Sequence, residues 1–309
     1  MANAYPTLFD IAVQNGADPL AGLIDETMKA TPEVRLGAAR TIPGINYRVN
    51  VRTALPTMAF RAANQGTAST KSTYENRLTE CYNLNPIWQC DKAVADSHID
   101  GAAAYIALEG SAMTLSAFQW ASSQFYYGNA VGTGNDVNGF PGLIQGYNTA
   151  NIIDAGGTTA NTGSSVWMVK FGPTYCQWVV GQNGNMSLTD VVEQILFDTN
   201  SLPYPGYVQS LMVRLGLQFG NTKTIVRIKK LTADNLCTLT DKMISDALAL
   251  FPAGYEPDVM FMTRRSRSQL RDSRTATNPT GQPAPIPEEA FGVPIAVTDG
   301  ISNTESLTL

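Results

Sequence analysis

Few residues in the chain have the types that covalent catalysis needs, and they lie far apart. The 309 residues include a single histidine, His98, which any Ser-His-Asp or Cys-His chemistry would have to use. A zinc site with two or more histidines is excluded. His98 lies between Asp96 and Asp100, just before an apolar stretch, where we expect a structural or solvent-facing side chain that suits a helix cap. The cysteines form no CxxC pair, and we expect reduced, mostly buried thiols at Cys81, Cys90, Cys176 and Cys237.

The glycine patterns of the sequence do not match those of phosphate-binding loops. The glycine-rich stretches 132–134 and 156–157 do not form GxxxxGK[ST], and neither stands between an apolar strand and a helix with GxGxxG. Phosphate loops need that order because backbone amides at a helix N-terminus hold the anion. We therefore predict no cofactor site and no metal site.

The strongest local charge feature is a basic run near the C-terminus. Its members are Arg264, Arg265, Arg267, Arg271 and Arg274. Asp272 lies inside the run, and the whole chain is acidic, with a net charge of −5 and an isoelectric point near 5.0. A dedicated nucleic-acid binder needs a basic surface to neutralise phosphates. We interpret the run as ion pairs within or between subunits, with nucleic-acid contact as the alternative.

One almost uncharged stretch, 101–129, must organise the rest of the chain. Apolar side chains recur there at steps of three and four residues, as on one face of a helix, at Ala104, Leu108, Ala112, Leu115, Phe118 and Phe125. Glu109, Ser116 and Ser123 form a narrow polar strip with seven-residue spacing. The pattern predicts a helix over 101–127, packed along its whole length by other parts of the protein. Its polar side chains and its lack of flanking lysine or arginine argue against a membrane span.

Two segments precede this helix. Residues 1–40 contain too few apolar side chains for a core, and predict either an arm or a helical edge of the main domain. Residues 41–92 begin with strict apolar–polar alternation at 47–52, the pattern of a half-exposed strand. After a loop at 64–66, apolar side chains return at even positions through 74–84. Because a lone hairpin is marginal in water, we expect this long hairpin to pack either on its own domain or on a neighbouring subunit.

The remainder of the sequence predicts an α+β fold. Strands are expected at 166–171, 176–180, 207–219, 223–231, 258–262 and 293–298. Gly220-Asn221 predicts a short hairpin connection between the two strands that flank it. Helices are expected from Thr238 or Thr240 to Phe251 and over 264–274.

Several short stretches resemble the major capsid proteins of tailed double-stranded DNA bacteriophages. They are RTALPT at 52–57, FR at 60–61, NQG at 64–66, FYYGN at 125–129, FPGL at 140–143 and NIIDAGG at 151–157, ahead of the strand that begins with VW at 166–167. The second half of the chain is less distinctive, although PDVM at 257–260 and GVPI at 292–295 are similar to strands of the same family. The order of these stretches carries more weight than any one of them.

The resemblance implies the HK97-like capsid fold. Its parts would be an N-terminal arm at 1–40, an E-loop hairpin at 41–92, a P domain at 93–232 that contains the spine helix, and an A domain at 233–309. In the prototype of the family, strands of the P domain follow the A domain. Here the candidate strands precede the A-like segment, so we infer a permuted order in which the P-domain sheet is completed first.

The same resemblance implies a self-assembling, non-enzymatic shell protein of the virion head, assembled in the host cytoplasm. Expected partners are copies of the chain in pentamers and hexamers, portal, scaffolding or decoration proteins, and packaged DNA bound without sequence specificity. We expect subunit contacts at Arg48, Arg52, Arg61, Lys71, Arg264, Arg265, Arg267 and Arg271. Some relatives cross-link an E-loop lysine to a neighbour, but the sequence identifies no catalytic carboxylate, so no such bond is predicted for Lys71.

Other functions fit parts of the sequence. An encapsulin-like compartment would keep the fold and enclose cargo enzymes instead of a genome. A phage tail or baseplate component would also be structural. From a different class, a hydrolase could use cysteine or serine with His98, and an ester assay of a His98→Ala variant would separate it from the shell proteins.

Overall fold

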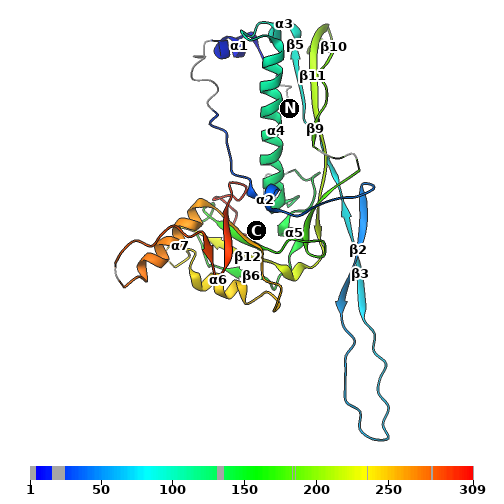
Figure 1. The fold of residues 1–309 in the computed structure, drawn as a ribbon, viewed down its shortest axis with the longest axis vertical. Coiled ribbons are helices and arrows are strands. Elements are labelled where there is room, and N and C mark those ends of the chain that lie inside the picture. Colours follow the sequence, from blue (N-terminus) through cyan, green and yellow to red (C-terminus); the bar gives the residue numbers. More distant parts are fainter. Residues whose placement is uncertain are drawn as a thin grey trace.

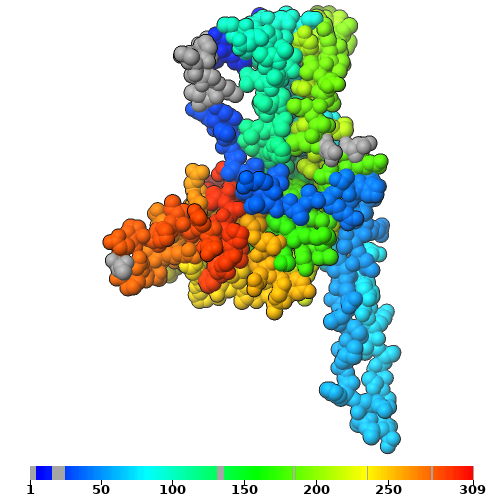
Figure 2. Space-filling model, in the orientation of Figure 1, coloured from blue at the N-terminus to red at the C-terminus, as the bar shows by residue number. Residues whose placement is uncertain are grey.

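The computed structural model describes residues 5–15, 25–130, 136–182, 184, 186–234, 236–279 and 281–308. It consists of a long helix with strands beside it, a compact body at one end of that helix, and a thin hairpin that projects away from both (Figures 1 and 2). No described helix is long and apolar enough to cross a membrane.

The long helix is α4, Ala102–Tyr127, and confirms the predicted spine. Glycines at both ends have positive φ, +83° at Gly101 and +54° at Gly128, which other residues adopt only with strain. Gly128 also has no room for a side chain, because an added Cβ would lie 1.8 Å from the backbone nitrogen of Gly142. The helix therefore ends at a close backbone crossing that glycine alone allows.

The strand beside this spine is β11, Pro203–Phe219, which is 17 residues long. It forms the centre of a seven-stranded sheet, and its antiparallel partners are β4 (Tyr82–Leu84), β5 (Ile87–Asp91), β8 (Cys176–Val180), β9 (Ser187–Leu188) and β10 (Val192–Phe197). The short β1, Ala39–Thr41, adds to β8 in parallel. Figure 1 shows β5, β10 and β11 running along α4.

The sheet covers only one side of the spine. Gly110 and Ala117 are buried against β9 and β11, whereas Ala104 and Ala112, both on the predicted apolar face, are exposed. The expectation that the helix is packed along its whole length is therefore wrong for the single chain. The reason is that one sheet can cover only one face of a helix, and the N-terminal segment covers only part of the remainder.

The compact body is built on a six-stranded sheet in the order β14-β15-β13-β7-β12-β6. These strands are Glu289–Ala290, Val293–Val297, Val259–Met262, Ser164–Val169, Ile225–Leu231 and Ile152–Asp154, in that order. All six residues of β7 are buried. Successive side chains of a strand point to opposite faces, so Val166 and Met168 enter one core while Trp167 and Val169 enter another.

Helices cover the two faces of this sheet differently. The helices α6 (Asp241–Leu248) and α7 (Arg264–Ala276) place Ile244 and Leu270 in the core that contains Met168. The opposite core takes Phe125 and Tyr126 from the end of the spine, and Leu143 from α5 (Leu143–Gly146). The two predicted C-terminal helices are thus present, and α6 is capped by the Thr240 hydroxyl, which accepts a hydrogen bond from the Met243 amide at 3.3 Å.

Two sequence expectations about the strands are wrong. β11 and β12 do not form a hairpin: a short 3-10 turn, Thr222–Thr224, joins them, and β12 pairs with β7 and β6 in the other sheet. The boundary between residues 232 and 233 also divides the six-stranded sheet, since β7 and β12 precede it and β13 and β15 follow it. The strands at 166–231 are therefore not one sheet beside the spine, which was the premise of the permuted order.

The predicted hairpin is present as β2 (Asn46–Ala54) and β3 (Thr73–Glu80). The two strands pair antiparallel from Asn46 opposite Glu80 to Ala54 opposite Thr73, and residues 55–72 form an unpaired tip. Residues 82–91, predicted to belong to the same projection, instead form β4 and β5 on the long sheet.

The N-terminal segment runs along the outside of the spine. Its helix α1 (Leu8–Asn15) buries Ile11 beside the short helix α3 (Lys92–Asp96) at the far end of the spine. From residue 25 the chain runs along the spine to α2 (Pro32–Leu36) at the compact body (Figure 1). We call residues 25–30 the strap.

Candidate functional site

The hairpin tip, residues 55–72, is the most exposed part of the described chain. Its side chains Leu55, Met58 and Phe60 are exposed, and Phe60 is completely so. Figure 2 shows that the tip extends well beyond the body. Large apolar side chains left in water at the end of a long projection indicate a surface that another molecule covers.

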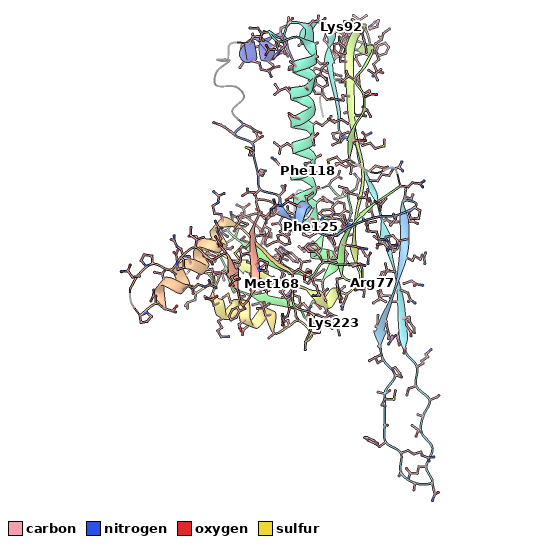
Figure 3. All side chains as sticks on the ribbon, viewed as in Figure 1. Arg77, Lys92, Phe118, Phe125, Met168 and Lys223 are labelled. Carbon is pink, nitrogen blue, oxygen red and sulfur yellow. The ribbon has the colours of Figure 1, made fainter. Side chains whose placement is uncertain are left out.

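The basic residues predicted on the hairpin also lie on its surface, and Figure 3 shows side chains projecting from both of its strands. Arg48, Arg61 and Lys71 are exposed and have no ion pair with any described residue. Arg52 is exposed and stands over the ring of Tyr74, with 5.7 Å between its guanidinium carbon and the ring centroid. The structure thus brings these four residues to one projection with the apolar tip, and leaves their charges available.

The arginines of α7 differ in their hydrogen bonds and ion pairs. Arg265 donates to three backbone carbonyls, those of Thr162, Leu231 and Asn303, at 2.7, 3.1 and 3.2 Å, and so fastens the C-terminal segment to the body. Arg271 pairs with Asp272 at 3.1 Å. Arg264 and Arg267 have no ion pair within the described chain. The run is therefore partly structural, and its part in subunit contacts stays a prediction.

A buried polar cluster, missed by the sequence reading, ties the chain end to the spine. Arg227 in β12 pairs with Glu305 at 3.2 Å and donates to the Ser165 hydroxyl at 3.0 Å. The hydroxyls of Ser165 and Tyr127 both donate to Glu305, at 2.5 and 2.6 Å. The guanidinium also lies 5.1 Å from the ring centroid of Trp167. A single arginine in the otherwise apolar start of a strand, IVRI, was the only signal of this cluster in the sequence.

A second missed group is Glu33 in α2. Its side chain is fully buried and accepts a hydrogen bond from the Tyr126 hydroxyl at 3.2 Å. Burial raises the pKa of this carboxyl above its ordinary value, because the charged form loses its hydration. The backbone carbonyl of Glu33 accepts from the indole nitrogen of Trp178 at 3.2 Å. Glu33 thus joins the N-terminal segment to the end of the spine.

His98, the one candidate for nucleophilic catalysis, lies between α3 and α4. Its Nδ1 accepts from the backbone amide of Asp100 at 3.2 Å, and its ring lies 5.7 Å from that of Tyr105. These contacts place His98 at a turn before the spine, as predicted from its flanking acids. Among the described residues no group of three or more histidine, cysteine or acidic side chains could hold a metal ion.

Comparison with known proteins identifies the family to which the chain belongs. A family model of the major capsid protein GP7 matches residues 40–308. The chain belongs to this family of major capsid proteins. It is accordingly a subunit of the shell that forms a phage virion head, and the match covers the hairpin, the spine and the whole compact body.

The match to one solved structure confirms the predicted α+β, HK97-like capsid fold. A chain of the bacteriophage Epsilon15 structure has a TM-score of 0.74 and 20 % identity, over 99 % of this chain and 98 % of that one. A chain of Mycobacterium phage Bobi gives a TM-score of 0.47 and 11 % identity, over 72 % and 97 %. An encapsulin complex from Synechococcus elongatus gives 0.47 and 10 %, over 74 % and 97 %. None of the curated proteins matches the chain.

Proposed function

We propose that the chain acts in the head as a purely structural subunit whose hairpin lies on a neighbouring copy. The observation that carries this proposal is the exposed tip, which combines Leu55, Met58 and Phe60 with basic side chains on a two-stranded projection. Such a hairpin is marginal in water by itself. Covering its apolar side chains with a neighbour stabilises both the hairpin and the shell, at about 25 cal/mol per Å² of apolar area removed from water.

The mode of contact fits closed shells. The hairpin of one copy and the surface that receives it on the next are different surfaces, so the contact is heterologous, and such contacts build rings when the rotation closes. We propose that residues 1–40 act as the N-terminal arm and β2–β3 as the E-loop, with β5, β10, β11 and the spine as the P domain. The six-stranded sheet with α6 and α7 would be the A domain.

We further propose that the residues predicted for subunit contacts act at these surfaces, and that portal, scaffolding or decoration proteins and the packaged DNA complete the head. The net charge of −5 supports a shell that encloses DNA without gripping it by sequence. The contacts of His98 are a backbone amide and a tyrosine ring. They support the absence of catalysis, because neither contact activates a serine or a cysteine.

Deletion of residues 62–72 tests the proposal. We expect the shortened chain to fold with an unchanged melting temperature, because this segment makes no contact with the body, and to form no shells. Circular dichroism measures the first property and negative-stain electron microscopy the second, with the full chain as control. Shells of normal size from the shortened chain would contradict the proposal.

A further inference from the structure

An apolar cavity lies between the N-terminal segment, the C-terminal half of the spine and the long sheet. Its volume is about 220 Å³. Five elements contribute to its wall, namely α2 with Val34, β1 with Ala39, the spine with Phe118, β8 with Trp178 and β11 with Leu215. Figure 3 shows Phe118 on the spine just above the compact body. The cavity is therefore bounded by segments that are far apart in the sequence.

The described side chains that line the cavity offer no hydrogen-bonding group to a ligand. None of them is charged, and the only N–H among them is the indole nitrogen of Trp178, which already donates to the carbonyl of Glu33 at 3.2 Å. The others are aliphatic, apart from the ring of Phe118 and the thioether of Met186. A polar group buried without a partner is unfavourable. The cavity should therefore select molecules that have no such group.

Hydrogen bonds outside the cavity hold its walls apart. The backbone amide of Trp178 donates to the carbonyl of Ala38 at 2.7 Å and joins β1 to β8, and β8 pairs with β11 along its whole length. On the opposite side, the hydrogen bond from the Tyr126 hydroxyl to the Glu33 side chain fixes α2 to the spine. Protein interiors are otherwise close-packed. A space of this size between walls that are fixed independently has the character of a preformed ligand site.

We propose that this cavity binds a small apolar molecule that has no hydrogen-bonding groups. An apolar cavity of about 150 Å³ stays dry and binds benzene, so this larger volume corresponds to a ligand of about nine carbon atoms. The ligand supplies the contacts that Val34 and Phe118 lack while the space is empty. The site lies within one subunit, so it does not depend on the proposed shell function.

The element that the ligand fixes is α2. This helix has five residues, and Glu33 is the only one of them that is buried. Val34 is half-buried, and it lines both the cavity and a wider groove on the side of β15. An apolar molecule in the cavity adds contacts to Val34 and holds α2 more firmly against the spine. The site thereby links an apolar ligand to the position of the N-terminal segment.

Thermal unfolding of the full chain tests the binding, with n-propylbenzene as the probe. We expect the melting temperature to rise by about 2 °C when the probe is at about ten times its dissociation constant. In 2-phenylethanol a hydroxyl replaces the terminal methyl of the probe, and the cavity would bury that hydroxyl without a partner. It should bind at least about tenfold more weakly. No rise with n-propylbenzene, or equal binding of the two compounds, would overturn the proposal.

Substitutions that fill the cavity locate the bound probe. Ala121→Leu narrows the cavity from the spine, and Val34→Phe narrows it from α2. Each should weaken the binding of n-propylbenzene at least about tenfold, because the added side chain takes the place of the probe. Ala104→Leu, at an exposed position of the same helix outside the cavity, is the matched control and should bind as the natural chain does. Unchanged binding by filled variants that are folded by circular dichroism would refute the site.

Limited digestion with trypsin tests the link to α2 without any substitution. Arg35 is an exposed cleavage site on α2, and Arg61 is an exposed cleavage site on the distant hairpin tip. We expect n-propylbenzene to slow cleavage after Arg35 and to leave cleavage after Arg61 unchanged. Equal slowing at both sites, or no slowing at either, would contradict a local effect on α2.

The alternative occupant is an apolar side chain of a neighbouring copy. It would enter the cavity only on assembly, so the probe would bind to unassembled subunits and not to shells. Equilibrium dialysis of n-propylbenzene against both forms separates the two cases. Binding that persists in shells supports a small-molecule site, and binding that is lost on assembly would assign the cavity to the neighbour and overturn the proposal.

Discussion

The compact body and the hairpin both contain paired strands, but the strands are buried in the body and exposed in the hairpin. In the compact body, β7 has partners on both sides and all six of its residues are buried. In the hairpin, β2 and β3 pair only with each other, and Thr79 is their one buried residue. The backbone pairing is the same in kind, so the difference lies in what covers the faces. Burial in the body provides folding stability, and we propose that exposure in the hairpin leaves apolar area to be buried on assembly.

Two phenylalanines give the largest expected contrast between these regions. Phe261 is fully buried against Phe125 and Tyr126, at ring-centroid distances of 6.1 and 6.0 Å, and Phe60 is fully exposed. We expect Phe261→Ala to lower the free energy of unfolding by about 3–5 kcal/mol through the cavity it leaves. Phe60→Ala should change it by less than about 0.5 kcal/mol. Urea unfolding of unassembled subunits measures both.

The same pair should behave in the reverse way in assembly. Phe60→Ala is expected to slow or prevent shell formation while its unfolding curve matches that of the natural chain. Equal losses of stability in the two variants would remove the contrast, because they would mean that the hairpin tip folds onto its own subunit.

A smaller loss of stability is expected when the buried ion pair between Arg227 of β12 and Glu305 is broken. Replacing Arg227 by Met removes the charge opposite Glu305 but leaves the hydroxyls of Ser165 and Tyr127 as donors. We expect a loss of about 3 kcal/mol, at the low end for breaking a buried pair, because those donors still solvate the carboxylate. Thermal unfolding measures it, with Arg48→Met on the hairpin as the matched surface control. A loss equal to that of the control would contradict the structural role of the pair.

The smallest expected effect is the contribution of Glu33 to the pH dependence of the free energy of unfolding. Its pKa is raised in the folded state by burial. As pH rises above about 4.3, the ordinary pKa of glutamate, the unfolded chain releases this proton before the folded chain does. The free energy of unfolding therefore falls with rising pH until the folded pKa is passed. The fall is about 1.4 kcal/mol for each pH unit that separates the folded pKa from the unfolded one.

Glu33→Gln removes this dependence, since the amide resembles the neutral acid and does not titrate. The variant should gain stability relative to the natural chain as the pH rises above the ordinary pKa of glutamate, and the two should converge at low pH. Denaturant unfolding at several pH values measures the difference, in which the other acids cancel. A difference that does not change with pH would show that Glu33 is not the titrating group.

Local patterns predicted the elements well and their partners poorly. The spine was predictable because an almost uncharged, proline-free run with three- and four-residue spacing has few other structures. The hairpin was predictable because alternation at 47–52 implies an exposed strand. The partners of the two strands that flank Gly220-Asn221 were not predictable, because the same turn residues occur in hairpins and in crossovers between sheets. The choice depends on β7, which lies more than fifty residues earlier in the chain.

Among the candidate surfaces too, those formed by one segment were predictable and those formed by distant segments were not. The exposed arginines of the hairpin could be predicted, because alternation places Arg48 and Arg52 on one side of a strand. The acidic groove that lies between the strap and the spine could not be predicted, because these two walls are far apart in sequence. Arg227 and Glu33 were missed for a similar reason: a single charge in a short segment shows burial only when the rest of the fold surrounds it.

The spine with one bare side has a consequence for the life of the newly made subunit. In the single subunit, Ala103, Ala104 and Ala107 on this side of the helix face water and can bind other apolar surfaces. We expect assembly and aggregation to compete for this side of the helix, and both become faster as the concentration rises. The yield of shells should thus pass through a maximum as more protein is supplied, so the host's rate of synthesis, as well as the fold, decides how many heads are completed.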